Sequence, residues 1–314
     1  MAGLVDNIGK LLHWSFVEKF PPGSPEFGLL VTPLLVYWAL AVFYDVLDHL
    51  DLPITRRFKV VRKVRGRENI PSKRQVVTRV LVQQLAQFVV AYVAMVLDCD
   101  QCAKRTAGNV AQTALQFLFG MLVMDTWQFW IHRTMHVYPV LYKHIHSHHH
   151  QLLIPYAWGA LYNHPLEGLL LDTLGGLVTL YGGMMSCQAG AWLINFATAK
   201  TVLDHCGYVF PVNPLHGLFP NGAAYHDIHH DIKNVKKNYS QPFFTHWDLL
   251  MGSYKSPEDF HVPAGKEALA AADAQALAVT EAVKARAKAV KAKAAEPEVE
   301  DASSQSKEES RKDK

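Results

Sequence analysis

Long stretches of apolar residues dominate the first part of the chain. The first runs from Phe27 to Leu47 without a basic residue, and the second runs from Val76 to Leu97. A third, from Val110 to Ile131, is interrupted by Asp125. A helix of about 20 apolar residues is long enough to cross the ~30 Å hydrocarbon core of a bilayer. The pattern therefore predicts three membrane-spanning helices.

Two further apolar stretches, residues 166–185 and 189–203, have the pattern of a helical hairpin. Both arms are short or interrupted by glycine, and Glu167 and Asp172 lie at one end of the first arm. Such arms can be tilted, re-entrant or packed against protein. The alternative, core helices of a soluble protein, requires burying five apolar stretches in one short chain. We therefore predict an all-α fold, an integral membrane helical bundle of about four transmembrane helices.

The loop between the first two stretches is strongly basic. Residues 51–80 contain ten Lys or Arg side chains against two acidic ones, Asp51 and Glu68. Because basic loops stay on the cytosolic side of a membrane, this loop is predicted to be cytosolic and residues 98–109 lumenal. The third stretch then returns the chain to the cytosol near His132. The basic loop also offers charge for an acidic protein partner, although a role as topological anchor explains it without one.

The composition agrees with a membrane protein and excludes several other classes. Half of the 314 residues are hydrophobic and only 19% are charged. The net charge of +3 is too small to indicate a nucleic-acid partner, and four cysteines do not make a disulfide scaffold. From Ala264 onward the chain is rich in Ala, Lys and Glu and lacks aromatic residues. We predict a membrane-embedded domain over residues 1–263 and a cytosolic tail over 264–314, helical and then disordered.

The chain contains an unusually large number of histidines, seventeen, and eight of them fall into three clusters. The clusters are His132 with His136, His146 with His149 and His150, and His226 with His229 and His230. Spacings of three and four residues place imidazoles on one face of a helix, and imidazole is the commonest metal ligand. Eight ligands exceed what one ion with an open position needs. The clusters predict a dimetal site in a cytosolic, histidine-rich helical cap.

Further polar residues extend the predicted site. His205 and His164 lie at the ends of the hairpin arms and are predicted as two more metal ligands; the alternative is that they support ligands or cap a helix. Asp125 lies two turns before His132, so its carboxylate is predicted to accept a hydrogen bond from a histidine ring. Asp227 is the alternative carboxylate for that supporting role.

The second cluster has an alternative register, because His144 and His148 are also four residues apart. On a helix these two side chains point away from His146, so both sets cannot reach one site. The recurrence of the 146/149/150 spacing at 226/229/230 favours the set that begins at His146.

Several strings around these histidines resemble one family. They are Asp-Thr-Trp-Gln-Phe-Trp-Ile-His-Arg-Thr-Met-His (125–136), Pro-Tyr-Ala-Trp-Gly-Ala-Leu-Tyr-Asn-His-Pro-Leu-Glu-Gly (155–168), Asp-His-Cys-Gly-Tyr (204–208) and Asn-Tyr-Ser-Gln-Pro-Phe-Phe-Thr-His-Trp-Asp (238–248). The pattern is similar to that of the membrane fatty acid hydroxylase superfamily, and the strings that flank the histidines resemble its sphinganine 4-hydroxylase branch. The resemblance is dense over residues 115–255 and loose over 25–115.

The resemblance implies a non-haem di-iron monooxygenase. The expected location is the endoplasmic reticulum membrane, and the charge bias of the loops predicts that the active site and the C-terminus face the cytosol. Its cofactors would be two iron ions, its co-substrate O2, and its electron donors cytochrome b5 and the reductase that serves it. The implied reaction adds a hydroxyl group at C4 of sphinganine, or of dihydroceramide, drawn from the bilayer.

Aromatic residues in two of the strings are predicted to line the path of the lipid substrate. They are Tyr156, Trp158, Tyr162, Phe243 and Phe244. The alternative is that they belong to the belt of aromatic residues found at membrane surfaces.

Other functions fit parts of the same pattern. A sterol 4-methyl oxidase or a lipid desaturase of the superfamily would use the same metals on another lipid. A membrane metal carrier would need ligands along a path across the membrane, whereas these clusters are predicted at one face. A haem-binding electron carrier would need paired axial histidines near the middle of a span.

Overall fold

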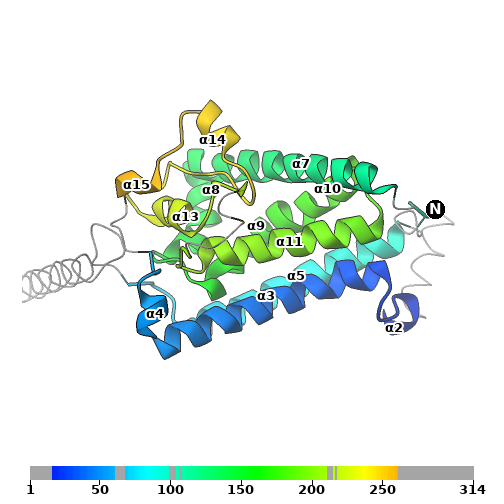
Figure 1. The fold of residues 1–314 in the computed structure, drawn as a ribbon, viewed down its shortest axis with the longest axis horizontal. Helices are drawn as coiled ribbons and strands as arrows, with labels where there is room; N and C mark the ends of the chain where they lie inside the picture. Colours follow the sequence, from blue (N-terminus) through cyan, green and yellow to red (C-terminus); the bar gives the residue numbers. More distant parts are fainter. Residues whose placement is uncertain are drawn as a thin grey trace, which may run out of the picture.

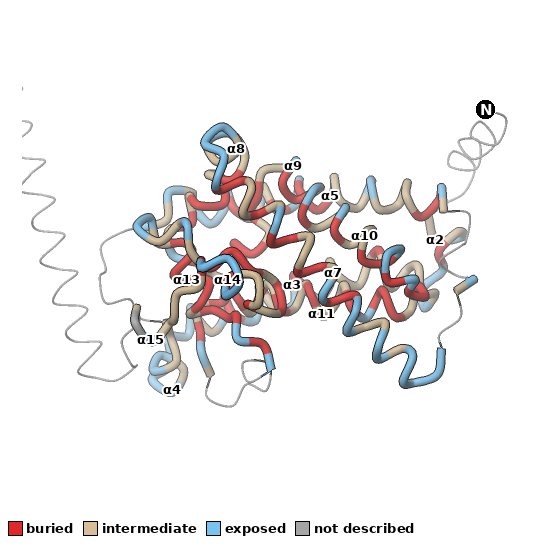
Figure 2. The backbone as a smooth tube through the Cα atoms, turned by 90° about the horizontal axis from the view of Figure 1, so that it is seen from above, coloured by how far each residue is buried: buried red, intermediate tan, exposed pale blue. Residues whose placement is uncertain are grey.

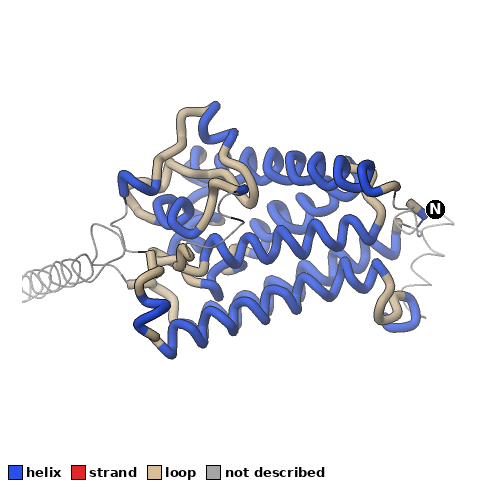
Figure 3. The backbone as a smooth tube through the Cα atoms, in the orientation of Figure 1, coloured by secondary structure: helices blue, strands red, loops and turns tan. Residues whose placement is uncertain are grey.

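The structure is a computed structural model that describes residues 16–60, 68–98, 104–105, 108–210, 215 and 218–260. These residues form helices and loops without a named strand, as Figure 3 shows, and a single isolated bridge pairs Lys59 with Tyr208. The all-α prediction is confirmed for this part of the chain. The predicted tail, residues 264–314, lies outside the described residues.

Four long helices run along the length of the molecule (Figure 1). They are α3 (Pro25–Leu50), α5 (Lys73–Leu97), α7 (Val110–Val137) and α11 (Cys187–His205). Each follows a Ser or Asn residue whose side chain accepts a hydrogen bond from a backbone N–H of the first turn; these N-caps are Ser24, Ser72, Asn109 and Ser186. Such caps satisfy donors that the helix itself leaves unpaired, so local sequence defines where each long helix begins.

Shorter elements connect and cover the long helices. They are α2 (Phe16–Lys19), α4 (Pro53–Arg56), α8 (Pro139–His144), the 3-10 helices η1 (His146–Gln151) and η2 (Ala157–Leu161), α9 (Pro165–Gly168), the π-helix η3 (Leu169–Leu174), α10 (Gly175–Gly182), α13 (Ala223–His230), α14 (His246–Leu250) and α15 (Pro257–Phe260).

The outer faces of the long helices are apolar. Leu35 and Phe43 on α3, Leu85 on α5, and Leu115 and Phe119 on α7 are all exposed. Figure 2 shows exposed turns along the outside of the bundle and buried segments through its centre. An apolar surface of this extent is unfavourable in water and favourable against lipid. The arrangement indicates a membrane protein.

Two helices, α3 and α5, are long and apolar enough to cross a membrane. The 26 residues of α3 correspond to roughly 39 Å at 1.5 Å per residue. The sequence predicted about four spans, and these two helices correspond to the first two of them. The stretch 166–185 is divided among α9, η3 and α10, and α10 lies beside α7. This arm is therefore packed against protein, one of the three arrangements that its short, glycine-interrupted sequence allows.

The short helices α8 and α13, which adjoin or carry the histidine clusters, lie at the same end of the bundle as α4 of the basic loop, opposite α2 (Figure 1). The α3–α5 connection contacts segments beside the histidines: the Val60 N–H donates to the Gly207 carbonyl at 2.9 Å, and the Ile70 N–H donates to the Gln151 carbonyl at 3.0 Å. The basic connection and the histidines thus lie at one end of the molecule, as the charge bias of the loops predicted.

A buried ion pair fixes α11 to the segment that leads into α13. Lys200 pairs with Asp204 one turn later on α11, and both side chains are buried. The Lys200 Nζ also donates to the Asn221 side-chain oxygen at 2.7 Å. A buried charge needs such partners. The contact holds the start of α13 against the end of α11, where His205 lies.

Candidate metal centre

Nine buried histidines converge in two groups at this end of the bundle. The first group is His132, His136, His146, His150 and His229; the second is His149, His205, His226 and His230. Within each group the ligand atoms lie within 4.8 Å of one another. The second cluster adopts the register in which His146, His149 and His150 are buried, whereas His144 is exposed.

The second and third histidine clusters of the sequence, on η1 and α13, each contribute ligands to both groups. In η1, His146 and His150 face the first group while His149 faces the second. In α13 the division is reversed, because His226 and His230 face the second group and His229 the first. The sequence predicted that all three members of a cluster share one face. Adjacent residues diverge by about 100° on an α-helix such as α13 and by about 120° on a 3-10 helix such as η1, so the adjacent members at i+3 and i+4 point to different groups.

Hydrogen bonds on the far side of the rings orient the histidines. The Nδ1 atoms of five rings lie 2.7–3.1 Å from backbone carbonyl oxygens: His132 on Tyr239, His149 on Tyr162, His205 on Thr201, His229 on Lys237 and His230 on Leu152. A carbonyl oxygen can only accept, so each Nδ1–H donates and the Nε2 lone pair is left free. Metal-bound histidines show this arrangement.

The free Nε2 atoms face one another across each group. In the first group the His132 and His146 Nε2 atoms are 3.0 Å apart, and in the second the His226 and His205 Nε2 atoms are 3.0 Å apart. Burial lowers the pKa of His146 to about 3 and that of His149 to about 4, so these rings are neutral near pH 7. Converging lone pairs repel unless a cation lies between them. The donor set therefore fits a divalent metal in each group.

The two groups are neighbours. The rings of His150 and His230, which belong to different groups, have centroids 4.8 Å apart, and those of His146 and His149 are 5.6 Å apart. Ions held in the two groups would therefore lie side by side in one buried centre.

Glu167 on α9 supports the first group. Its Oε1 atom lies 2.5 Å from His146 Nδ1, and both side chains are almost fully buried. A Cβ atom on the next residue, Gly168, would lie 1.4 Å from the Gln83 side chain of α5, so only glycine allows this close approach. Glu167 was not among the predicted site residues. The available signal was an acidic residue inside an otherwise apolar arm.

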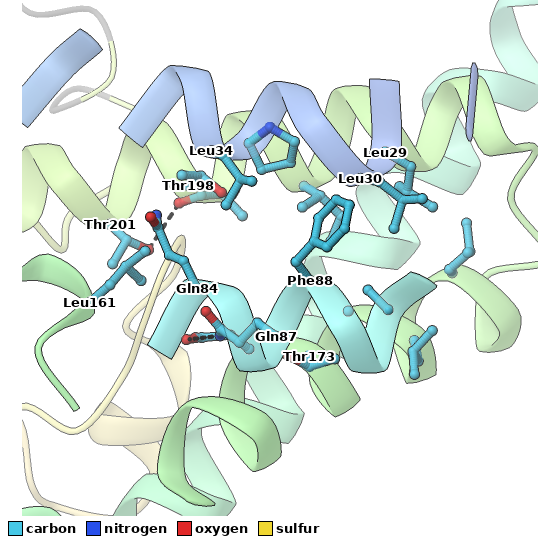
Figure 4. A pocket seen from close by; sticks show the side chains of 18 of the residues that line it. Leu29, Leu30, Leu34, Gln84, Gln87, Phe88, Leu161, Thr173, Thr198 and Thr201 are labelled. Atoms are coloured by element: carbon cyan, nitrogen blue, oxygen red, sulfur yellow. Dashed lines mark hydrogen bonds between the residues drawn. The ribbon is translucent and has the colours of Figure 1, made fainter. Parts of the chain in front are cut away.

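A cavity of about 180 Å³ begins beside the centre and extends between α3, α5, α7, α10 and α11 (Figure 4). Thr201, whose carbonyl accepts from His205 Nδ1, lines it, as does Gln128, one turn before His132. On α5 the lining runs from Gln84 to Met95, and the rise between these two residues is roughly 16 Å of helix.

The lining of the cavity changes along its length. Gln84, Gln87 and Thr201 lie in one part of the view in Figure 4, and Leu29, Leu30 and Phe88 lie toward the other. The Gln87 Nε2 donates to Asp172 Oδ2 at 3.1 Å, which places a carboxylate in the polar part. A site with polar groups near the centre and an apolar extension fits an amphiphile with a long alkyl chain.

Comparisons with known proteins agree with this site. The model of the fatty acid hydroxylase family matches residues 117–253. "Sphinganine C4-monooxygenase 2" of Arabidopsis thaliana is 45% identical over 235 residues, which cover 74% of this chain and 88% of the relative. The chain belongs to the fatty acid hydroxylase family. The resemblance inferred from the sequence is thereby confirmed.

Two other similar members of the family carry different names. "Sphingolipid C4-hydroxylase sur2" of Schizosaccharomyces pombe is 37% identical over 272 residues, covering 77% of this chain and 92% of the relative. "Very-long-chain aldehyde decarbonylase GL1-9" of Oryza sativa subsp. indica is 44% identical over 222 residues, covering 71% of this chain and 86% of the relative. No solved structure matches the chain.

The other predicted site residues have surroundings that differ from those predicted from the sequence. His164 lies outside both groups: its Nδ1 accepts from the Leu166 N–H at 3.2 Å and caps α9. The Asp125 carboxylate accepts backbone N–H groups of Phe243 and Phe244, at 3.0 and 2.6 Å, instead of a histidine ring. Asp227 is buried on α13 between the histidines.

The five aromatic residues predicted to contact substrate do not line the cavity. The Trp158 ring packs on Trp38, with centroids 5.3 Å apart, and the Tyr162 carbonyl accepts from His149. Phe243 is fully buried in the apolar core. Phe244 packs against that core, and Tyr156 packs against a second apolar cluster that contains Trp158 and Tyr162. The described contacts of these residues are structural, and the cavity is lined by residues of the helices instead.

Replacing Glu167 with alanine is expected to weaken metal binding by roughly 10–100-fold, the usual cost of removing the partner of a metal-bound histidine. The reason is that the His146 ring loses the acceptor that fixes its orientation. Glu167→Gln retains an acceptor oxygen and should keep most of the metal. Metal content after dialysis against a chelator series measures the difference, and equal retention by Glu167→Ala and the parent protein would contradict it.

Proposed function

We propose that this chain is a sphingolipid 4-hydroxylase, an O2-dependent monooxygenase that places a hydroxyl group at C4 of sphinganine or dihydroceramide. The observation that carries the proposal is the position of the cavity: Thr201 and Gln128, which lie one turn before His205 and His132, line it, and it continues into an apolar interior. The names of two similar relatives, a sphinganine C4-monooxygenase and a sphingolipid C4-hydroxylase, support this choice of substrate.

We infer that the two histidine groups hold two iron ions. His132, His136, His146, His150 and His229 would hold one ion, and His149, His205, His226 and His230 the other. Bound there, iron supplies the activation of dioxygen, which protein side chains cannot perform. The imidazole-only donor set fits iron but also accepts zinc, so metal found after purification is informative only together with activity.

The residues of the chain bind and orient the lipid. Apolar side chains such as Leu30 and Met95 surround the alkyl chain, and the polar part of the cavity lies beside Gln84, Gln87 and Asp172. In sphinganine the polar groups are on C1, C2 and C3, and C4 is the next carbon, so a polar wall next to the histidines favours C4 over carbons further along the chain. Burial of the centre excludes water and holds one carbon in position for reaction.

The membrane arrangement in this proposal has about four crossing segments, formed by the long helices and the hairpin. The centre faces the cytosolic side of the endoplasmic reticulum membrane, because α4, in the basic α3–α5 connection, lies at the same end as α13 with its histidines. Cytochrome b5 and its reductase supply electrons from that side. The gathering of the histidines at one end also argues against a metal carrier, which needs ligands along its path.

The proposal is tested by product analysis in a host that lacks sphingolipid 4-hydroxylase activity. Expression of the chain under 18O-labelled dioxygen is expected to yield 4-hydroxylated sphingoid base with one labelled oxygen at C4. A desaturated base, an oxidised 4-methyl sterol or unlabelled product would overturn it.

The second candidate is an aldehyde decarbonylase, which the similarity to the rice protein favours. Both candidates use the same histidine centre, so metal analysis does not separate them. Supplying a very-long-chain aldehyde to the same membranes does: an alkane one carbon shorter supports the second candidate, and its absence beside hydroxylated base supports the first.

A further inference from the structure

A monooxygenase of this type needs a protein that delivers electrons. Inserting one oxygen atom of O2 into a C–H bond and releasing the other as water consumes two electrons and two protons. The electrons must reach the buried histidine groups from a partner that docks on the surface. The docking site is therefore expected to lie where the surface comes closest to a metal ligand.

The segment that follows α13 brings the surface close to a metal ligand. His229 Nδ1 donates to the backbone carbonyl of Lys237 at 2.8 Å, and His229 Nε2 lies 3.1 Å from His136 Nε2 in the first group. One hydrogen bond and one peptide unit thus connect a residue of the surface segment with the histidine centre.

The same segment carries a cluster of lysines, which we call the lysine segment: Lys233, Lys236 and Lys237, with Lys255 beside them. The Lys255 Nζ donates to the Asn234 Oδ1 at 2.7 Å, and the Lys237 Nζ donates to the Gly252 carbonyl at 3.1 Å. Lys233 and Lys236 are exposed, and the neighbouring Ile232 is 52% exposed. An apolar side chain surrounded by cationic groups is a typical centre for a protein interface.

The charges of the lysine segment are not neutralised by carboxylates within the described part of the chain. None of its four lysines forms an ion pair there. The nearby Asp231 carboxylate is bound instead by the Lys233 backbone N–H and the Asn234 side chain, at 3.2 and 2.7 Å. Four lysines against this one carboxylate leave the segment with a positive net charge.

The basic α3–α5 connection differs in this respect. Lys59 pairs with Asp48 at 3.0 Å, Lys73 pairs with Asp45 at 2.5 Å, and Arg56 pairs with Asp51. Part of the positive charge that the sequence offered for an acidic partner is thus neutralised by the end of α3. The unneutralised cluster that contacts a predicted metal ligand is the lysine segment.

We propose that the lysine segment is the docking surface for an acidic one-electron carrier protein, and that electrons pass from it to the first histidine group through the Lys237–His229 hydrogen bond. The proposal rests on the proposed function, because only a reaction that consumes electrons requires a donor. Complementary charge would accelerate encounter, and Ile232 would provide apolar contact at the centre of the interface.

The test uses the full-length chain in lipid nanodiscs and the soluble haem domain of cytochrome b5 as the acidic probe. The double variant Lys233→Glu/Lys236→Glu is expected to weaken binding of the probe about 10-fold at low ionic strength, and to reduce the salt dependence of binding. Metal content and product formed with dithionite as reductant should match the parent protein. The control Arg57→Glu/Arg74→Glu makes the same charge change at the end of α4 and in the first turn of α5 and should alter binding less than twofold.

The outcomes separate the docking surface from the function. Unchanged binding by the lysine variant, or an equal loss in the control, would overturn the docking proposal even if the hydroxylated product is found. A selective loss of binding and of probe-driven reduction supports it. If the protein forms another product while the lysine variant still loses the probe, the assignment of substrate fails and the docking surface stands.

Discussion

Replacement of His136 by alanine is expected to reduce hydroxylated product by roughly 100-fold or more, because removing even the partner of a metal ligand typically costs ~10–100-fold. His136 Nε2 lies 3.1–3.2 Å from three other ring nitrogens of the first group. Without it, that group loses a ligand at its centre. Iron per chain and product per chain, measured on the same sample, check the prediction.

His205→Ala tests the second group in the same way. Its Nε2 lies 3.0 Å from His226 Nε2, so we expect a similar loss of product. His144→Ala is the matched control, since this histidine is exposed and lies two residues before the cluster that begins at His146. Full activity of His205→Ala, or a comparable loss in the control, would contradict the division into two groups of ligands.

Ala91→Phe is expected to shift the preference of the enzyme toward shorter sphingoid bases by about 10-fold or more. Ala91 lines the cavity among the apolar residues of α5, and a phenyl ring there would displace the end of a long alkyl chain. Each buried methylene contributes about 0.8 kcal/mol. Excluding two or three methylenes of the longer base therefore lowers its kcat/KM, relative to that of the shorter base, by about 10-fold or more. Competition between longer and shorter bases in one reaction measures the ratio.

A matched control lies on the same helix. Val89 is half exposed on the outer face of α5 and does not line the cavity, so Val89→Phe should leave the ratio unchanged. If Ala91→Phe lowers the rates for all chain lengths equally, the cavity does not hold the alkyl chain.

Periodicity was sufficient for the parts of the site that lie on regular helices. The spacing of His132 and His136, and the recurrence of one pattern in two clusters, predicted which imidazoles gather. The division of each cluster between two groups was not predicted, because it depends on how η1 and α13 face each other. Spacing along one helix describes that helix alone and contains no information about the segment opposite.

Contacts between distant segments account for the other differences. Asp125 was expected to reach a histidine two turns along α7, but the backbone of Phe243 and Phe244 lies against it and offers two N–H donors. Glu167 contacts His146 only because α9 folds back onto η1. His164, placed among the ligands by its sequence neighbours, caps α9 instead. Each of these outcomes is decided by tertiary packing rather than by local pattern.

The exchange of His149 and His229 between the two groups has a consequence for how the protein acquires its metal. Each ion would tie η1 to α13, so filling one position brings the remaining nitrogens of the other into place. We expect cooperative loading, with half-filled protein scarce at intermediate iron concentration. Stripping one ion should likewise release its neighbour, so the two ions together would act as one cross-link that holds the helix ends at this end of the bundle.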